Sequence, residues 1–166
     1  MRWLIVLLLV SCDAGAPGTH GTAPDGSMGG TADGAGGSPA ADQLCVSETN
    51  RYRSLRSKLP LTASAQLEEF ANTGARVDFG SSPSSHFSAT QGGGIAFAEN
   101  ECPQQSNWQT HPGQDASAAV VDCLAEFFAE GTAGAHYQNM IGNFGSVGCG
   151  VYQVGTKITV VQDFGR

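Results

Sequence analysis

The stretch Ala135-His136-Tyr137-Gln138-Asn139-Met140, followed closely by Val147-Gly148-Cys149-Gly150, is the most specific part of this sequence. It places a histidine on a short apolar segment of helical character, just before a strand that opens with Gly-Cys-Gly. Downstream, residues alternate on both sides of Gly155-Thr156, which predicts an antiparallel hairpin. The stretch therefore predicts a histidine held on a helical turn next to a C-terminal β-hairpin.

Three segments upstream have helical character. The first should begin near Asp42, whose side chain can cap a helix, and it must stop by Leu59, because Pro60 pushes the preceding residue out of the helical region. Two more helices are expected at about residues 63–77 and 116–130, where apolar residues recur at three- and four-residue intervals. Between them, a Gly/Ser/Pro-rich loop leads to His86, and a strand leads to Glu99.

The first 41 residues are typical of an export signal and a tether. One cation, Arg2, precedes a short apolar run that resembles a secretory signal and is too short to span a bilayer. The run ends in Leu9-Val10-Ser11-Cys12, which resembles a bacterial lipobox, so we expect residues 1–11 to be removed and Cys12 to be lipidated. An ordinary signal peptide, cleaved near residues 14–16, is the alternative. Residues 12–41 are small or polar and predict a disordered tether, which leaves 42–166 as the folded domain.

The charge of the chain limits its partners. The formal net charge is -7 at pH 7 when the four histidines are counted as neutral. An acidic surface without a basic patch repels phosphate polyanions, so we expect no nucleic-acid partner and no binding to anionic membrane surfaces through the domain itself. Contact with a membrane is expected only through the lipid anchor at Cys12.

Several short motifs, in order along the chain, carry a family resemblance. The segments His136-Tyr137 and Val147–Gly150 resemble the "GHYTQ…VGCG" signature of the CAP superfamily, which groups cysteine-rich secretory proteins, antigen 5 and pathogenesis-related 1 proteins. The other matching motifs are Asn50 and Arg53 ("HNxxR"), Leu59-Pro60-Leu61 ("LPPL"), Ala98-Glu99-Asn100 ("GEN", with Ala98 in place of glycine) and Ala119–Glu126 ("AVxxWxxE", with Cys123 in place of tryptophan). The resemblance implies an α+β fold, a three-layer α-β-α sandwich around a small, mostly antiparallel sheet.

The resemblance also implies a site. Members of the family gather two histidines and two glutamates in one cleft, and the matching residues here are His86, Glu99, Glu126 and His136. Glu101 and Glu130 are the alternatives for the two carboxylates.

The cysteines predict two disulfide bonds. With Cys12 set aside, Cys45, Cys102, Cys123 and Cys149 form an even set in an exported chain. Four cysteines allow three pairings, and the sequence does not decide among them. Our preferred pairing joins Cys45 to Cys123, both on expected helices, and Cys102 to Cys149, both next to the expected cleft.

Three functions of different classes remain open. The first is an envelope binding module that holds a divalent metal through His86 and His136, zinc above all, or a lipid-like ligand or an envelope protein as partner. The second is a metal- or water-dependent hydrolase that uses Glu99 or Glu126 as a base. The third is a passive surface protein in which the four residues only hold loops in place. No Gly-x-Ser-x-Gly motif and no cysteine nucleophile is evident, so enzymatic activity is undecided.

Overall fold

The computed structural model describes residues 38–104 and 115–166, and these form a four-stranded sheet between two layers of helices. The strands lie in the order β1-β3-β4-β2. Strand β1 runs parallel to β3, whereas β3 pairs with β4 and β4 with β2 in antiparallel fashion. The bounds of the strands are β1 Thr62–Ala63, β2 Ala98–Cys102, β3 Ser146–Val154 and β4 Lys157–Gly165. The long β3–β4 hairpin is the one that the alternation predicted.

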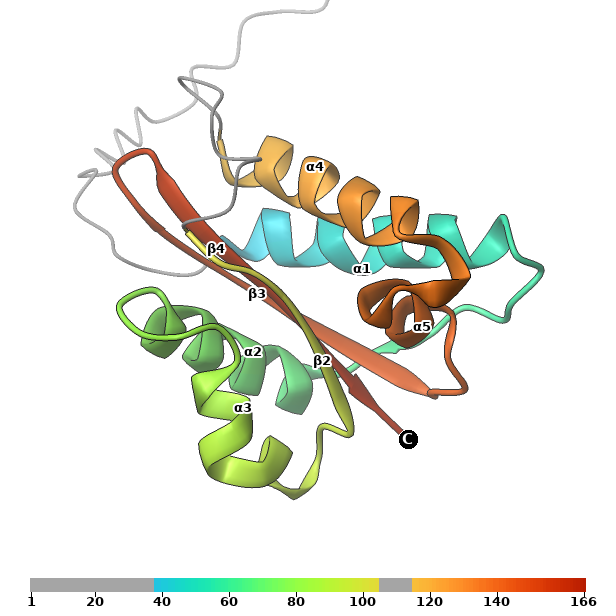
Figure 1. The fold of residues 1–166 in the computed structure, drawn as a ribbon, viewed down its shortest axis with the longest axis horizontal. Coiled ribbons are helices and arrows are strands. Elements are labelled where there is room, and N and C mark those ends of the chain that lie inside the picture. The colour runs from blue at the N-terminus through green and yellow to red at the C-terminus, as the bar shows by residue number, and fades with distance from the viewer. Residues whose placement is uncertain (1–37, 105–114) are drawn as a thin grey trace, which may run out of the picture. The chain divides into compact units, whose positions relative to one another are not determined.

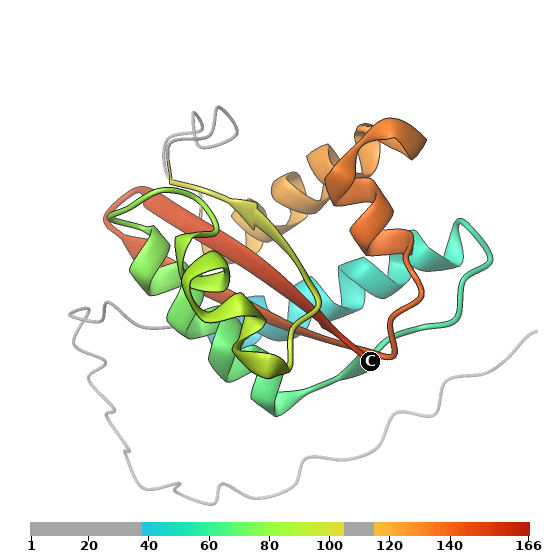
Figure 2. The same cartoon turned by 60° about the horizontal axis from the view of Figure 1, so that its bottom comes forward.

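Helices cover both faces of this sheet (Figure 1). One face carries α1 (Pro39–Ser54), α4 (Ala116–Ala129) and α5 (Ala135–Ile141), and the other carries α2 (Ala65–Asp78) and α3 (Ser85–Thr90), as the turned view in Figure 2 also shows. Two 3-10 turns, Gln91–Gly94 and Gly131–Ala133, complete the described elements. The predicted α-β-α sandwich is therefore confirmed. No helix in the described part of the chain is long and apolar enough to cross a membrane.

The Gly-Cys-Gly motif of β3 explains how the sheet meets both layers. Side chains alternate across a strand, so Gly148 and Gly150 face α2 while Cys149 faces α1. A Cβ on Gly148 would lie 2.2 Å from the backbone of Leu67, and one on Gly150 would lie 2.2 Å from the backbone of Ala71. The two glycines thus let α2 pack with its backbone against the sheet, which no larger residue would permit.

The predicted pairing of the cysteines is wrong, although two disulfide bonds are present. Cys45 of α1 is bonded to Cys149 of β3, and Cys102 at the end of β2 is bonded to Cys123 of α4. Cys45 and Cys123 do both lie on helices, but α1 and α4 lie side by side in one layer, and each of these cysteines is bonded to a cysteine of the sheet. Each bond therefore joins a helix to a strand on the same face of the sheet.

Asn50 and Arg53, which carried part of the family resemblance, have structural contacts. Asn50 accepts a hydrogen bond from the backbone N–H of Leu61 (2.7 Å) and donates one to its carbonyl (3.0 Å). The buried guanidinium of Arg53 donates to the carbonyls of Leu59 (2.9 Å), Met140 (2.7 Å) and Gly142 (3.0 Å). These bonds fix the chain after α1 and the C-terminal end of α5, because each satisfies backbone groups that no helix or strand pairs.

The helix boundaries agree with the sequence in two cases and differ in one. Ser64 caps α2 and Asp115 caps α4, as their side chains accept from Leu67 N and Ala118 N. The first helix begins three residues earlier than expected, at Pro39, and Asp42 does not cap it. Asp42 is buried in the first turn and accepts a hydrogen bond from Asn72 of α2 (3.3 Å). Cys12 and the other residues of the expected signal and tether up to 37 lie outside the described residues.

Candidate metal site on the α2–α3 face of the sheet

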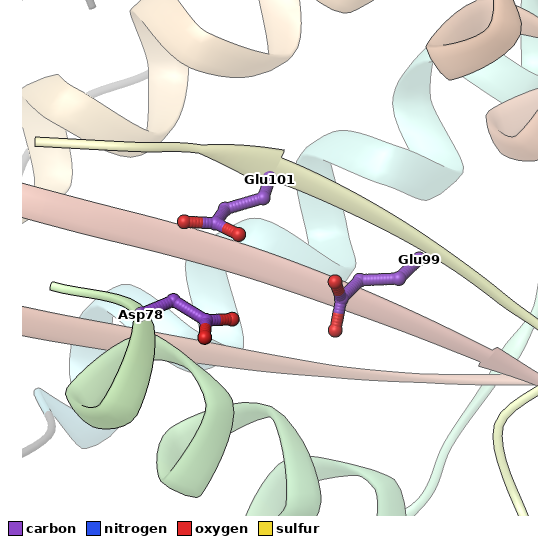
Figure 3. Close-up of side chains that lie close together, drawn as sticks. All are labelled: Asp78, Glu99 and Glu101. Atoms are coloured by element: carbon purple, nitrogen blue, oxygen red, sulfur yellow. The ribbon is translucent and has the colours of Figure 1, made fainter. Parts of the chain in front are cut away.

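Three carboxyl groups converge between β2 and the end of α2. Glu99 and Glu101 are two residues apart on β2, so both side chains lie on the same face of the sheet. Asp78 is the last residue of α2 and faces them. Figure 3 shows the three carboxyl groups turned toward one another, and one oxygen of each lies within 4.8 Å of one of each of the others. We call Asp78, Glu99 and Glu101 the acidic triad.

The start of α3 orients two members of the triad. The backbone N–H of His86 donates to Asp78 Oδ1 (2.9 Å), and the hydroxyl of Ser85 donates to the same oxygen. The backbone N–H of Ser84 donates to Glu101 Oε2. Each carboxyl is thereby held by one oxygen, while the second oxygen, Asp78 Oδ2 or Glu101 Oε1, is buried without a hydrogen-bond partner. Such an arrangement fixes a ligand oxygen in place and leaves it available.

A fourth carboxyl group, that of Asp163, lies beside the triad. Asp163 is opposite Glu99 in the β2–β4 register and is fully buried. Its carboxyl group forms a hydrogen bond with the Glu99 carboxyl when one of the two is protonated. No other donor among the described residues reaches the two oxygens of Asp163. Polar groups that are buried without partners are rare in proteins and call for an explanation.

The electrostatics of the four groups follow from their burial. Removal from water, together with the charges of Asp78 and Glu99, raises the pKa of Glu101 to about 8. Burial and then the charge of Asp78 raise the pKa of Glu99. Burial and then the charge of Glu99 raise the pKa of Asp163. Without a cation, the cluster therefore holds protons at a pH where ordinary carboxyl groups are ionised.

His86 lies next to Glu99 of the triad and is partly exposed to solvent. It lies in the first turn of α3, not in a loop as expected, and its ring packs against Phe70 of α2 at 4.7 Å between ring centroids. A Cβ placed on Gly74 would lie 3.6 Å from His86 Cδ2 and 3.9 Å from Glu99 Oε2, so both side chains approach the same point of α2. Outside His86, a hollow of about 420 Å³ is lined in part by Phe70 and Ile95.

His136 has a different neighbourhood, on α5. Its Nδ1 lies 2.5 Å from Glu130 Oε1, and its backbone N–H donates to Glu130 Oε2 at 3.1 Å. The imidazole stacks on Phe127 of α4, with ring centroids 4.4 Å apart. Glu126 is exposed on α4. The carboxylate that contacts His136 is that of Glu130, one helical turn further along the chain. Of the two alternatives for this carboxylate, the structure brings Glu130 to the histidine.

The fold, the two disulfide bonds and these histidine and glutamate positions can be compared with known families. The model of the cysteine-rich secretory protein family, CAP, matches residues 46–164. The chain belongs to the CAP family. No curated protein sequence matches the chain.

In this CAP domain, the two histidines flank the same part of β2 from opposite faces. His86 approaches the Glu99 side chain on the α2 face. On the other face, the Asn100 side chain donates to the His136 carbonyl at 3.0 Å, because neighbouring residues of a strand point in opposite directions. Asn139 donates to Asn100 Oδ1 (2.9 Å) and to the Glu99 carbonyl (3.1 Å), which anchors α5 to the edge strand.

The expected four-residue set is not a compact set of metal ligands. Within residues 38–104 and 115–166, the group of three or more His, Cys, Asp or Glu side chains with mutually close ligand atoms is the acidic triad, and of the four expected residues only Glu99 belongs to it. Neither His86 nor His136 belongs to this group, so the prediction of a zinc ion held by the two histidines gains no support from it. The donor set that is present consists of carboxylate oxygens.

Two members of the cluster, Asp78 and Asp163, were not anticipated from the sequence. Asp163 had a recognisable signal, since it is a carboxylate within the otherwise uncharged strand segment Ile158–Phe164, at a position whose neighbours are buried. Charged residues are almost never fully buried without a partner, so such a position indicates a site. Asp78 gave no comparable signal, because an acidic residue at the end of an amphipathic helix is common on surfaces.

Proposed function

We propose that this CAP domain is an exported binding module that holds a divalent cation at Asp78, Glu99 and Glu101. The observation that carries the proposal is the convergence of three carboxyl groups, which leaves Asp78 Oδ2 and Glu101 Oε1 buried without a hydrogen-bond partner. Three carboxylates in one small volume repel one another and lose solvation, and a bound cation would relieve both effects.

Export is part of the proposal. Two disulfide bonds, Cys45–Cys149 and Cys102–Cys123, fit a compartment that is oxidising. The apolar run before Cys12 supports translocation, and lipid on that cysteine would tether the domain to a bacterial membrane through residues 13–37. A disulfide-tied binding domain on a tether agrees with a role at the cell envelope.

The hollow beside His86 supports a second ligand. Phe70 and Ile95 give it apolar surface, and His86, Thr73 and Gln66 give it polar groups. A lipid-like molecule or a segment of an envelope protein would lie there with its polar end next to His86. The hydrolase alternative, with Glu99 or Glu126 as the base, has less support. Glu126 is exposed on α4 and its side chain forms no hydrogen bond or ion pair within the described residues, and Glu99 belongs to the triad that the proposal assigns to the cation.

The experiment is a calorimetric titration of chelator-treated protein with CaCl2, MgCl2, MnCl2 and ZnCl2. We expect one cation per chain and a higher melting temperature on binding, since a ligand that binds only the folded state stabilises it by about 2.7 kcal/mol at a hundred times its Kd. Glu101→Gln should weaken binding by at least about tenfold. The matched control is Glu126→Gln, which alters a glutamate of the expected family set outside the triad and should bind as the parent does.

Two results would contradict the proposal. One is the absence of binding heat and of any melting shift with all four cations. The other is a Glu101→Gln protein that binds as tightly as the parent, since the cation would then lie elsewhere.

A further inference from the structure

We propose that a hollow at the C-terminal end of α1 binds the phosphate group of an anionic phospholipid, so that the domain itself docks on a membrane surface. The hollow has a volume of about 610 Å³, and its lining includes three cations, Arg53, Lys58 and Arg166. It shares no residue with the acidic triad, and none of its described lining side chains is acidic. The inference goes beyond the proposed cation site and does not depend on it.

The cations of the chain are unevenly distributed. The chain has eight lysines and arginines, and four of them, Arg51, Arg53, Arg56 and Lys58, lie in one short segment, whereas no aspartate or glutamate occurs from residue 49 to residue 67. The net charge predicted that the domain would not bind anionic membranes. The local excess of cations is the reason to depart from that prediction, because exposed charges more than about 8 Å apart are largely screened at physiological salt.

The end of α1 brings two of these cations together. Ser57 has a φ of 53°. Its N–H donates to the Ser54 carbonyl (3.0 Å), and the N–H of Lys58 donates to the Arg53 carbonyl (3.1 Å). These two bonds form a Schellman motif, in which the residues at the positions of Arg53 and Lys58 are often in hydrophobic contact. Here both are cations and both line the hollow. Like charges at these positions repel each other, and a bound anion would relieve the repulsion.

Neither cation is neutralised by the described part of the protein. Arg53 is 3% exposed, and its guanidinium donates to three main-chain carbonyls. The two ion pairs found within residues 38–104 and 115–166 include neither Arg53 nor Lys58. Burial lowers the pKa of Arg53, since the loss of solvation is not offset by an acidic neighbour among these residues. Buried charges are normally paired, so the hollow favours an anionic ligand.

The apolar part of the lining favours a lipid over a free anion or a nucleic acid. Leu59 lines the hollow next to Lys58 and is 83% exposed, more than any other large apolar side chain in the described part of the chain. Phe144 also lines it. Cations beside exposed apolar side chains suit the interface of an anionic bilayer, where phosphate groups and acyl chains are adjacent. We therefore expect the phosphate between Arg53 and Lys58, and Leu59 among the acyl chains.

The first experiment measures binding to vesicles of phosphatidylcholine alone and of phosphatidylcholine with phosphatidylglycerol. All proteins are the full chain with Cys12→Ser, so that no lipid anchor forms. The buffer contains EDTA, so that no divalent cation bridges the acidic triad to lipid. Vesicles of phosphatidylcholine alone measure the contribution of the apolar run at residues 4–10, which is the same in every protein. We expect phosphatidylglycerol to increase binding of the parent.

Two variants with matched controls locate the contact. Lys58→Glu should weaken binding to the anionic vesicles at least about fivefold, since one cation near an anionic surface contributes about this factor. Lys157→Glu makes the same change of net charge at an exposed lysine of β4 and should bind within about twofold of the parent. Leu59→Ser should also weaken binding at least about fivefold, through lost apolar burial, whereas Val154→Ser, at another exposed apolar residue, should not.

Three results would overturn the proposal. If phosphatidylglycerol does not increase binding of the parent, the domain does not recognise an anionic membrane. If Lys58→Glu and Lys157→Glu weaken binding equally, the hollow is not the site of contact. If Lys58→Glu weakens binding but Leu59→Ser does not, the site holds an anion without contact to acyl chains, and the assignment to a lipid is wrong.

A second measurement needs no variant in the hollow. Amide signals of the ¹⁵N-labelled chain are followed by NMR during titration with dihexanoyl phosphatidylglycerol and, separately, with sodium phosphate. We expect the signals of residues 57–59 and 143–145 to shift at lower concentrations of the lipid than of phosphate. Equal shifts with both would indicate a site for free phosphate, and shifts confined to other residues would place the lipid elsewhere; either result contradicts the proposal.

Discussion

On the face covered by α1, α4 and α5, large apolar side chains of the helices, such as Leu124 and Met140, belong to one buried cluster with Phe164 of β4. Both disulfide bonds join the sheet to helices on this face. On the face covered by α2 and α3, the apolar cluster consists of Ala71, Ala75 and Val161 with the partly buried Tyr152. That second face also holds four buried carboxyl groups. The same strands thus carry a conventional core on one side and a charged cluster on the other.

Polar groups on the two faces are also treated differently. On the α1 face, Asn100 donates to Gln162 (3.1 Å), and Gln162 donates to Thr49 (2.6 Å), which in turn donates to the Cys45 carbonyl (2.7 Å). On the α2 face, carboxylate oxygens remain without partners. The contrast indicates that stability comes mainly from the first face, so the second can keep an unfavourable cluster of charges for binding.

The largest expected effect comes from opening the disulfide bond between the two most distant cysteines. Cys45–Cys149 spans 104 residues and Cys102–Cys123 spans 21. Because a longer closed loop restricts the unfolded chain more, Cys45→Ala/Cys149→Ala should lower the free energy of unfolding by about 4.7 kcal/mol and Cys102→Ala/Cys123→Ala by about 3.4 kcal/mol. Urea unfolding of both double variants measures this. Losses under about 1 kcal/mol for both would show that the first face does not dominate stability.

A smaller effect is expected from pH, and it reports on the second face. The pKa of Glu101 is raised to about 8 in the folded protein, and burial raises the pKa values of Glu99 and Asp163 as well. The folded state then binds more protons than the unfolded state above about pH 4.5, so the free energy of unfolding falls as pH rises toward 8. The metal-free protein should lose at least about 2 kcal/mol between pH 5 and pH 8.

Glu101→Gln provides the control for this pH dependence. The variant should flatten the decline, because the glutamine stays neutral throughout. In the parent, a saturating concentration of the divalent cation that binds should restore stability at pH 8. Asp42, with a pKa raised to about 6, adds a further fall in the free energy of unfolding as pH rises, and this fall is complete near pH 6. A metal-free protein that is more stable at pH 8 than at pH 5 would contradict the buried-charge interpretation of the α2 face.

Much of the fold could be predicted because it depends on local patterns. Periodicity identified α2 and α4, and alternation identified the hairpin. The Gly-Cys-Gly motif was one of five motifs that carried the family resemblance. The structure gives the reason for it, since Gly148 and Gly150 admit the α2 backbone while Cys149 reaches α1. These features are visible in sequence because each requires a particular residue type at a particular spacing.

The pairing of cysteines and the composition of the acidic cluster could not be predicted, because both depend on which elements become neighbours. Cys45 could reach a helix or a strand, and only the packing of α1 on β3 decides. In the same way, Asp78 and Asp163 join Glu99 because α2 ends over β2 and because β4 lies next to it. The motif alignment favoured Glu126, whereas the turn of α4 brings Glu130 to His136.

The smallest expected effect concerns the one glycine of α2, Gly74, which lies next to His86 and Glu99. A Cβ there would lie 3.6 Å or more from its neighbours, which is ordinary contact, and alanine favours a helix interior over glycine. Gly74→Ala should therefore stabilise the metal-free protein by about 0.5–1 kcal/mol. Gly150→Ala is the opposite case, because its Cβ would lie 2.2 Å from the Ala71 backbone and should prevent normal packing of α2. Thermal unfolding of the two variants shows where the α2 face has free space. If Gly74→Ala lowers the melting temperature as much as Gly150→Ala does, the region around the acidic triad is packed as tightly as β3. A cation could then not enter it without moving α2.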